Sequence, residues 1–405
     1  MLRIIGAVLT TVSAVLFLTV FVADLFGLHA NPYLGVIFFL ILPAVFVAGL
    51  VLFGVGHWPS RWPRIDLNDP TKRTTAIIVV ALTIANVTIV SMAAYRGVEY
   101  VDSVSFCGQV CHTVMQPEFV AHQTGAHANV KCIDCHAGPG AMSFVSAKAA
   151  GTRRVRAVIR GSYSTPIVPE PKQLPTASET CQQCHSPARF SGEKTRRILE
   201  YADNEKNAPS ETKIKVDLRK VHTHIEKGIE FLATDKTRQT ITRVRLKDGG
   251  EFSIAAAPGQ PASPKPLAAE AWRRIDCTDC HNRPSHVIAP TADRAVNEAI
   301  AAGAVPVSLP FIHREAVKAL KAGNPAALRD FYRSQPSADV DRAVAAVQGI
   351  YSRNVFPPMN VTFGSYPNNI GHIDSPGCFR CHDDDHKSKD GKKIGQDCET
   401  CHAIE

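Results

Sequence analysis

Three long apolar runs dominate the first 98 residues of the chain. They cover Ile4–Ala23, Tyr33–Val55 and Thr74–Tyr95. Each run holds about 20 residues or more without a charged side chain, which is enough for a helix to cross the hydrocarbon core of a bilayer. Buried helices of soluble proteins rarely combine this length with this composition. The pattern therefore predicts a multi-pass membrane anchor of three helices over residues 1–98.

Basic residues predict the orientation of this anchor. The segment after the second run contains Arg61, Arg64, Lys72 and Arg73, whereas the connection after the first run has no lysine or arginine. The positive-inside rule then places the N-terminus in the cytoplasm and residues 96–405 in the periplasm, outside a bacterial inner membrane. The first run could instead be a signal peptide. Its apolar length and the lack of a clear cleavage site favour a retained helix.

Beyond residue 98 the chain is polar, and its apolar positions come in short stretches. Alternating residues at Thr240–Leu246 and Glu251–Ile254 flank Asp248-Gly249, which is a hairpin signal. Together with Ile214–Val216 they predict a small β element. The composition of Pro258–Pro266 is typical of a linker. Two later segments have the periodicity of helices, Thr291–Ala302 and Arg314–Lys321.

All twelve cysteines lie in this polar part as six short pairs, each followed directly by a histidine. Two residues between the cysteines put both thiols on one face of a helical turn. There they can add to the two vinyl groups of one haem, while the histidine ligates the iron. The pattern predicts six haem c groups. Five motifs are regular: Cys132/Cys135/His136, Cys181/Cys184/His185, Cys277/Cys280/His281, Cys378/Cys381/His382 and Cys398/Cys401/His402.

The first motif, Cys107/Cys111/His112, is one residue longer, and a bulge must absorb the extra residue. Two other uses of the cysteines fit less well. Zinc sites need no histidine directly after each second cysteine, yet all six pairs have one. Disulfides are possible in the periplasm, but short pairs that each precede a histidine are not a disulfide framework.

Eight histidines outside the motifs supply candidates for the second axial ligands. We predict His127, His224, His286, His372 and His386 as distal ligands, and His122, His222 and His313 remain alternatives. His222 and His224 are two positions apart, and we expect only one of them to face an iron. Ligation by two histidines gives lower potentials than ligation by histidine and methionine, which suits electron transfer near a quinone pool.

Net charge changes the picture little. The formal charge of +8 would favour an acidic partner or membrane surface. Six haems would add roughly twelve negative charges through their propionates, so the mature protein can be acidic. We expect no nucleic-acid partner.

Residues 106–187 resemble the NapC/NirT family of membrane-bound tetrahaem quinol dehydrogenases. The residues that carry the resemblance are the run from Cys107 to Glu118, Gly125-Ala-His127, Cys132-Ile-Asp134-Cys135-His136 and Cys181-Gln-Gln-Cys184-His185. Further segments, such as Asp276-Cys277-Thr-Asp-Cys280-His281-Asn-Arg-Pro-Ser-His286, are similar to a larger subgroup with several N-terminal spans. That subgroup passes electrons towards periplasmic carriers in anaerobic or metal-reducing respiration.

The resemblance implies quinol oxidation. In the family a methionine after the first motif ligates the first haem, and a lysine beyond the second motif serves the quinol site or ligates haem; Met115 and Lys148 match those positions. The acidic residue that the family places beyond the lysine is absent here, where the chain has Arg153-Arg154-Val-Arg156. Three acids near the third span are therefore candidates to accept quinol protons: Glu99, Asp102 and Glu118.

The expected architecture is a membrane-anchored multihaem cytochrome c, with three N-terminal transmembrane helices followed by a mainly helical and loop periplasmic haem domain with a small β element. We divide it into the anchor (1–98), a NapC/NirT-like trihaem domain (99–190), a haem-free β-containing segment and linker (191–268), and a C-terminal trihaem domain (269–405). Elsewhere we expect loops and short helices, because haems replace side chains as the core.

The favoured function is oxidation of membrane quinol, with electrons relayed along six haems to a periplasmic cytochrome or reductase. Two other classes remain. The chain could be a pure electron-relay subunit of a larger membrane complex, or a multihaem terminal reductase, which the abundant spare histidines argue against. Whether it forms a homo-oligomer or joins a complex is left open.

Overall fold

The computed structural model describes residues 1–25, 36–56, 68–138, 140–168, 175–186, 189–254 and 272–404. The predicted linker Pro258–Pro266 and the basic residues Arg61 and Arg64 lie outside these ranges. The chain forms two compact units, residues 1–115 and residues 116–405, and each is described by itself.

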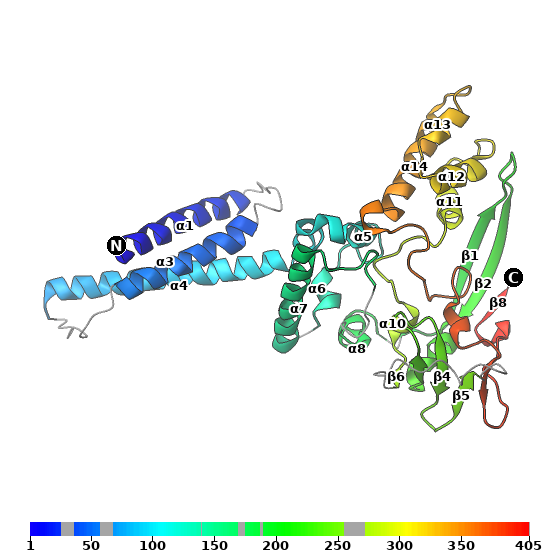
Figure 1. The fold of residues 1–405 in the computed structure, drawn as a ribbon, viewed down its shortest axis with the longest axis horizontal. Helices are drawn as coiled ribbons and strands as arrows, with labels where there is room; N and C mark the ends of the chain where they lie inside the picture. Colours follow the sequence, from blue (N-terminus) through cyan, green and yellow to red (C-terminus); the bar gives the residue numbers. More distant parts are fainter. Residues whose placement is uncertain are drawn as a thin grey trace. The chain divides into compact units, whose positions relative to one another are not determined.

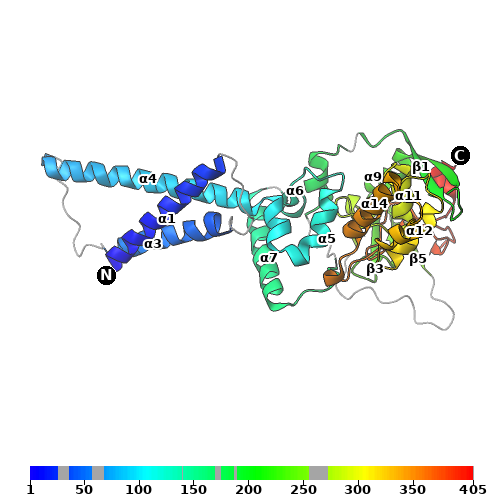
Figure 2. The ribbon, with the colours of Figure 1, turned by 90° about the horizontal axis from the view of Figure 1, so that it is seen from above.

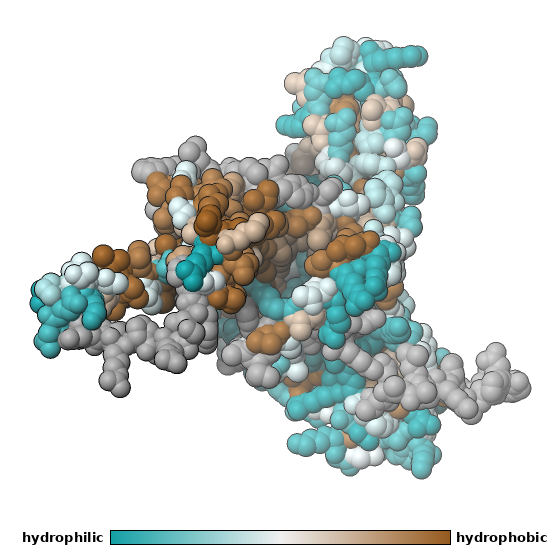
Figure 3. All heavy atoms as spheres, turned by 60° about the vertical axis from the view of Figure 1, so that its left-hand side comes forward, coloured by the Kyte–Doolittle hydropathy of each residue, from teal (hydrophilic) through white to brown (hydrophobic). Residues whose placement is uncertain are grey.

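The first unit is built from the three apolar runs. They form helix α1 (Leu2–Leu25), the π-helical turn η1 (Ile37–Ile41) with helix α3 (Leu42–Gly56), and helix α4 (Pro70–Val101). At most 17% of the apolar window of each helix is buried against protein, so the side chains face outward, as lipid requires. Figure 3 shows the brown, hydrophobic surface gathered on this unit. The three predicted spans are confirmed as helices long and apolar enough to cross a membrane.

Helices α1 and α3 lie side by side, as Figures 1 and 2 show from two directions. Two glycines permit this close approach. A Cβ atom on Gly6 would lie 2.5 Å from the backbone nitrogen of Phe53, and one on Gly49 would lie 2.7 Å from that of Thr10. Small residues at such contacts are the usual means by which membrane helices pack. Arg3 donates to the carbonyl of Gly56, so the N-terminus and the end of α3 lie at the same end of the pair.

Helix α4 is longer than the predicted run. Asp69 accepts hydrogen bonds from the backbone N–H groups of Thr71 and Lys72, and Pro70 occupies the first helical turn, which together fix the start. Beyond α4, the π-helical turn η2 (Phe106–Val110) contains Cys107. A π-helix is a wider turn than an α-helix, and this is the form taken by the expected bulge in the longer first motif.

The second unit begins within α5 (His112–Gln123), which is followed by α6 (Cys132–His136), α7 (Ala141–Arg160), α8 (Ala177–Thr180) and the 3₁₀ turn η4 (Cys181–Gln183). Then come strands β1 (Glu193–Tyr201) and β2 (Pro209–Asp217), helix α9 (Leu218–Glu226), and strands β3 (Glu230–Ala233), β4 (Ile241–Arg245) and β5 (Glu251–Ile254). The predicted hairpin is confirmed as β4 and β5, joined through Gly249 at a φ of +96°.

Two antiparallel sheets hold this unit together. One has the order β1-β2-β8, and the other has the order β6-β3-β4-β5-β7. Three of the four outer strands come from the C-terminal part of the chain: β6 (Arg273–Arg274), β7 (His386–Ser388) and β8 (His402–Ile404). Segments 191–268 and 269–405 therefore share both sheets, and the β content exceeds one hairpin.

The remaining elements are motif turns and a helical module that lies between the first and second of them in the sequence. The motif turns are α10 (Cys277–Cys280), η7 (Gly377–Arg380) and η8 (Cys398–Thr400), while η6 (Pro357–Met359) follows the module. The helical module comprises α11 (Ala292–Ala301), α12 (Ile312–Lys321), α13 (Ala327–Phe331) and α14 (Ala338–Asn354). Both predicted helices are confirmed as α11 and α12. Helix α14, which begins after a Ser337 cap, replaces the loops and short helices expected there.

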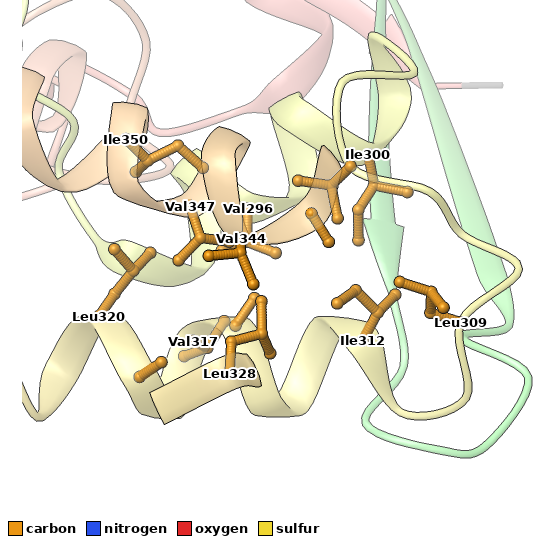
Figure 4. Close-up of a cluster of buried hydrophobic side chains, with 14 of the residues drawn as sticks. Val296, Ile300, Leu309, Ile312, Val317, Leu320, Leu328, Val344, Val347 and Ile350 are labelled. Atoms are coloured by element: carbon orange, nitrogen blue, oxygen red, sulfur yellow. The ribbon is translucent and has the colours of Figure 1, made fainter. Parts of the chain in front are cut away.

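The helical module has a side-chain core of its own. Val296 and Ile300 of α11 point towards Ile312 of α12 and Val347 of α14, as Figure 4 shows. Val296, Ile312 and Val347 are completely buried. This module contains no cysteine motif, so its core needs no cofactor.

Candidate haem sites

The five regular motifs lie on short helical turns. In three of them the histidine N–H donates to the carbonyl of the first cysteine: His185 to Cys181 at 2.8 Å, His281 to Cys277 at 2.7 Å and His382 to Cys378 at 3.1 Å. The turn thereby brings both thiols and the imidazole close to one another. Acidic caps fix two of these turns, since Asp134 and Asp279 accept from the backbone N–H groups of Lys131 and Asp276.

The cysteines are not used in other ways in the described structure. None of the twelve forms a disulfide. Across the ranges that the structure describes, no three or more histidine, cysteine or acidic side chains cluster as a metal-ion site. The twelve thiols thus remain as six separate pairs.

Each regular motif histidine faces a second histidine from elsewhere in the second unit. The ring centroids are 5.9 to 6.4 Å apart in all five cases. The pairs are His136 with His286, His185 with His127, His281 with His222, His382 with His224, and His402 with His372.

This spacing fits one haem iron between each pair of rings. An imidazole nitrogen binds a first-row metal at about 2 Å and lies about 1 Å from its own ring centre, so two coaxial ligands place the centroids roughly 6 Å apart. The five observed separations agree with that value. The residues present therefore fit haem c with two axial histidines at each regular motif.

Hydrogen bonds set the tautomer of the distal rings. A backbone carbonyl can only accept, so the ring nitrogen beside it must carry the proton. The Nδ1 atom of His127 contacts the Pro284 carbonyl at 3.2 Å, and that of His286 contacts the Glu118 carbonyl at 3.1 Å. His222 and His224 are held in the same way by Leu218 and Val221. In all four rings Nε2 is left as the free ligand atom, as is usual for metal-bound histidines.

The other three histidines are arranged differently. His122 uses Nε2 to donate to the Val130 carbonyl at 2.9 Å, so that atom is not available to an iron. His313 lies with Nδ1 2.8 Å from Asp203, far along the chain from any motif. His386 is fully buried, its Nδ1 is 2.9 Å from Asp383 and its Nε2 has no hydrogen-bond partner. None of the described ring contacts joins His386 to a motif histidine, and its ligation stays a prediction.

His222 is the residue that the sequence prediction left out of the distal set. It faces His281 at 6.4 Å, while His224 faces His382 at 6.0 Å. Both histidines of the His-Thr-His run therefore face motif histidines, contrary to the expectation for only one. Residues two apart on a helix project to nearly opposite sides, and this was the signal in the sequence for two ligands rather than one.

The surroundings of several of the paired histidines favour the neutral form of the ring. The pKa of His136 is lowered to about 4, first by burial and then by the positive fields of His286 and Arg154, against the opposing field of Glu118. Burial also lowers the pKa of His224, His281 and His286. Because only neutral imidazole can bind iron, these environments hold the rings in the form that ligates.

Consecutive motifs lie next to one another. The pKa of Cys135 is raised by burial and then by the nearby Cys181 thiol, and the same thiol adds to burial at Cys277. Likewise Cys378 contributes, after burial, to the raised pKa of Cys401. The pKa of Cys280 is raised to about 11 by burial, with Cys378 among the smaller contributions. From the second motif to the sixth, each motif thus lies next to the motif that follows it in the sequence.

The segment His281–His286 connects three of these sites. His281 belongs to the fourth motif, the Pro284 carbonyl holds His127 opposite the third motif, and His286 faces His136 of the second. Arg283 anchors the segment through an ion pair with Glu118 at 3.0 Å and a stack on Tyr366 at 3.8 Å. A single short loop therefore orders three haem sites.

A buried ionic cluster joins the fourth and fifth motifs. Asp279, which lies between Cys277 and Cys280, pairs with Arg238 at 2.8 Å and Arg273 at 3.0 Å. The Asp279 carbonyl accepts from Arg380 of the fifth motif at 2.7 Å. Because Asp279 and Arg238 are both buried, this cluster depends on complete pairing.

The residues predicted for quinol chemistry fall in both units, and one of them, Glu99 on α4, pairs with Arg96 at 3.1 Å. Asp102 is buried at the end of α4, where its N–H donates to the Val98 carbonyl, and Met115 is half-buried in α5. In the second unit, Lys148 is half-buried in α7, and Glu118 is held by Arg283 and lies 3.2 Å from His286. Glu118 therefore contacts a distal histidine, a role that the sequence did not indicate.

Comparisons with known proteins agree with this picture. A sequence model of the NapC/NirT cytochrome c family, N-terminal region, matches residues 69–224. The chain is 36% identical to the cytochrome c-type protein ImcH of Geobacter sulfurreducens, over all of this chain and 87% of that protein. It is 33% identical to the cytochrome c nitrite reductase subunit NrfH of Nitratidesulfovibrio vulgaris, over 22% of this chain and 56% of that subunit. No solved structure matches the chain.

Proposed function

The chain belongs to the NapC/NirT cytochrome c family of membrane-anchored electron-transfer proteins with covalently bound haem c, and from that premise we propose that it carries six haems and oxidises membrane quinol. The electrons pass along the haems to a periplasmic cytochrome or reductase. The observation that carries the proposal is the set of five motif histidines, each facing a second histidine at the spacing of an iron site.

The arrangement supports relay rather than reaction at a single centre. Bound haem supplies reversible one-electron chemistry. The protein would supply two nitrogens to the iron at each of five motifs, and it keeps consecutive motifs adjacent. A terminal reductase needs an open axial position for its substrate, and these five sites have none.

Quinol chemistry is assigned to the membrane end of the chain. The first motif begins in η2, directly after α4 within the same unit, so its haem is the one tied most closely to the bilayer. By family resemblance, Met115 ligates that iron and Lys148 binds the quinol headgroup. Glu99, Asp102 and Glu118 are the candidates to accept a proton from quinol.

A haem count tests the first part of the proposal. The mass of the purified protein should exceed that of the bare chain by six haems. A mass with five would show that the longer motif at Cys107 and Cys111 is not loaded. Bound zinc without haem would remove the whole proposal.

Quinol kinetics test the second part. Lys148→Met keeps the bulk of the side chain and removes its charge, and it should slow reduction by a quinol analogue about tenfold, or roughly 1.4 kcal/mol in barrier. Reduction by dithionite should change little. Lys194→Met on β1, an exposed lysine, is the matched control. Equal quinol rates in both variants, with all haems present, would exclude Lys148 from the site.

Two further measurements address topology and the remaining rival. A reporter fused after Glu405 should be active in the periplasm, and one inserted at Asn68 only in the cytoplasm. A periplasmic signal at Asn68 would reverse the orientation. The second measurement is whether quinol reduces the haems of the isolated protein. A quinol dehydrogenase should be reduced, whereas a pure relay subunit should be reduced only within its complex.

A further inference from the structure

We propose that helix α9 ligates two different irons, with His222 binding the haem on Cys277/Cys280 and His224 binding the haem on Cys378/Cys381. The inference rests on the proposed haem loading of these motifs, and it goes further by making one helical turn the shared support of the fourth and fifth redox centres.

The helix geometry separates the two rings. Residues two positions apart are rotated by about 200° around a helix axis, so His222 and His224 point to opposite sides of α9. His222 faces His281 at 6.4 Å, and its ring also stacks on Phe190 at 4.8 Å. His224 faces His382 at 6.0 Å. Neither histidine can reach the other's partner without unwinding the helix.

The helix itself fixes both tautomers. His222 donates from Nδ1 to the Leu218 carbonyl at 2.7 Å, and His224 donates from Nδ1 to the Val221 carbonyl at 3.0 Å. These acceptors lie four and three residues back along the same helix. Each Nε2 thereby has its lone pair available to bind iron, without help from any other segment.

Both ends of α9 are held, which prevents the helix from turning about its axis. Asp217 caps the N-terminus by accepting from the Arg219 and Lys220 backbone N–H groups, and Lys220 reaches the Glu399 carbonyl at 3.2 Å. At the other end, the Ile225 carbonyl accepts from Arg274 at 3.3 Å. Strands β2 and β3 continue the chain on either side, so each sheet fixes one end.

The two sites differ in the angle between their imidazole planes. The rings of His222 and His281 are nearly parallel at 5°, whereas those of His224 and His382 are nearly perpendicular at 88°. Ligand-field splitting in low-spin ferric haem depends on this angle. Parallel planes give a rhombic EPR signal, and perpendicular planes give a strongly anisotropic one, so the two sites can be told apart in the same protein.

Single replacements test the assignment on the full-length, haem-loaded protein. Because methionine raises the potential of a haem relative to histidine, His222→Met should move one centre to higher potential and remove a rhombic signal. His224→Met should move a different centre and remove a strongly anisotropic signal. Lys194→Met, at an exposed lysine on β1, is the control and should leave the spectra unchanged.

A rescue experiment keeps the test decisive if methionine disturbs folding. His222→Gly should convert one haem to high spin, and added imidazole should restore the rhombic signal. His224→Gly should behave in the same way for the other centre. The inference is overturned if both replacements affect the same centre, or if either leaves every haem signal unchanged. A haem mass below five, by contrast, would contradict the proposed function and not the role of α9.

Discussion

The helical module and the haem motifs that flank it are stabilised by different interactions. In the module, apolar side chains from four helices meet in one core, and several of them are completely buried. In the motif segments, cysteines and paired histidines are half-buried or exposed, and the buried contacts are those of the charged cluster around Asp279. One region can be folded by the hydrophobic effect alone, whereas the other is complete only when its cofactors are attached.

The contrast shows in which regions the apolar repeat of the sequence predicts secondary structure. A side-chain core requires a helical repeat of apolar residues, so helices of the module such as α11 and α12 can be predicted from the sequence. A haem needs only a short turn with two thiols and one histidine, and the surrounding chain is free to be irregular. The two regions should therefore respond to different mutations, and four predictions follow this division from the largest expected effect to the smallest.

Removing one haem should damage the motif region and spare the module. The double replacement Cys277→Ser and Cys280→Ser leaves no thiol to hold the fourth haem, so the protein should lack one haem by mass. Hydrogen exchange should accelerate in α9, whose His222 loses its partner centre, while α11, α12 and α14 keep their protection. Equal loss of protection in the module would show that the two regions do not differ in this way.

Breaking the ionic cluster should destabilise the motif region by charge rather than by volume. Asp279→Asn leaves the Arg238 guanidinium without its carboxylate, while Arg273 keeps its ion pair with Asp276, and it should cost about 3 kcal/mol because Arg238 and Asp279 are buried. Asp341→Asn, which breaks the exposed pair with Arg329 in the module, should cost less than about 1 kcal/mol. Chemical denaturation compares the two, and similar losses would contradict the distinction.

Opening a cavity should weaken the module alone. Ile312 is completely buried, and Ile312→Ala should lower the free energy of unfolding by about 2–5 kcal/mol. The haem mass and the EPR spectrum should stay unchanged, because no motif lies in the module. Lys318→Ala on the exposed side of the same helix is the control. A changed haem spectrum in Ile312→Ala would show that the core supports the redox centres directly.

The smallest effect is expected at Glu118. Its carboxylate lies 3.2 Å from Nδ1 of His286, but its carbonyl also accepts from that nitrogen at 3.1 Å. Glu118→Gln should thus keep the ligand in place and remove only the negative charge behind it. The potential of the haem on Cys132/Cys135 should rise by less than about 60 mV, a tenfold change in a one-electron equilibrium. A fall in potential, or loss of that centre, would contradict a supporting role for the carboxylate.

Much of the framework could be predicted from local sequence. Apolar runs gave the three spans, and Thr291 caps α11 as its position suggests. The extra residue of the first motif, for which a bulge was predicted, lies in the π-helical turn at Cys107. In each case the determining residues are neighbours along the chain, so their effect can be read without knowing the rest of the fold.

Contacts between distant segments could not be predicted in this way. Glu118 and Arg283 are 165 residues apart, and nothing near Glu118 indicates its partner. The pairing of His136 with His286 and of His402 with His372 likewise depends on how the loops return. Helix α14 was missed because the whole C-terminal part was expected to have a cofactor core, although Ser337 offers a helix cap.

The loop His281–His286 also has a consequence for the order in which the protein matures. A chain made from its N-terminus presents the second and third motifs before the loop exists, since Cys132 and Cys181 both precede His281. Under the proposed ligation, a haem attached to Cys132 and Cys135 would receive its second histidine only after the fourth motif has been synthesised. The later segment would then complete the earlier site, and a chain truncated before His281 should lack that second ligand.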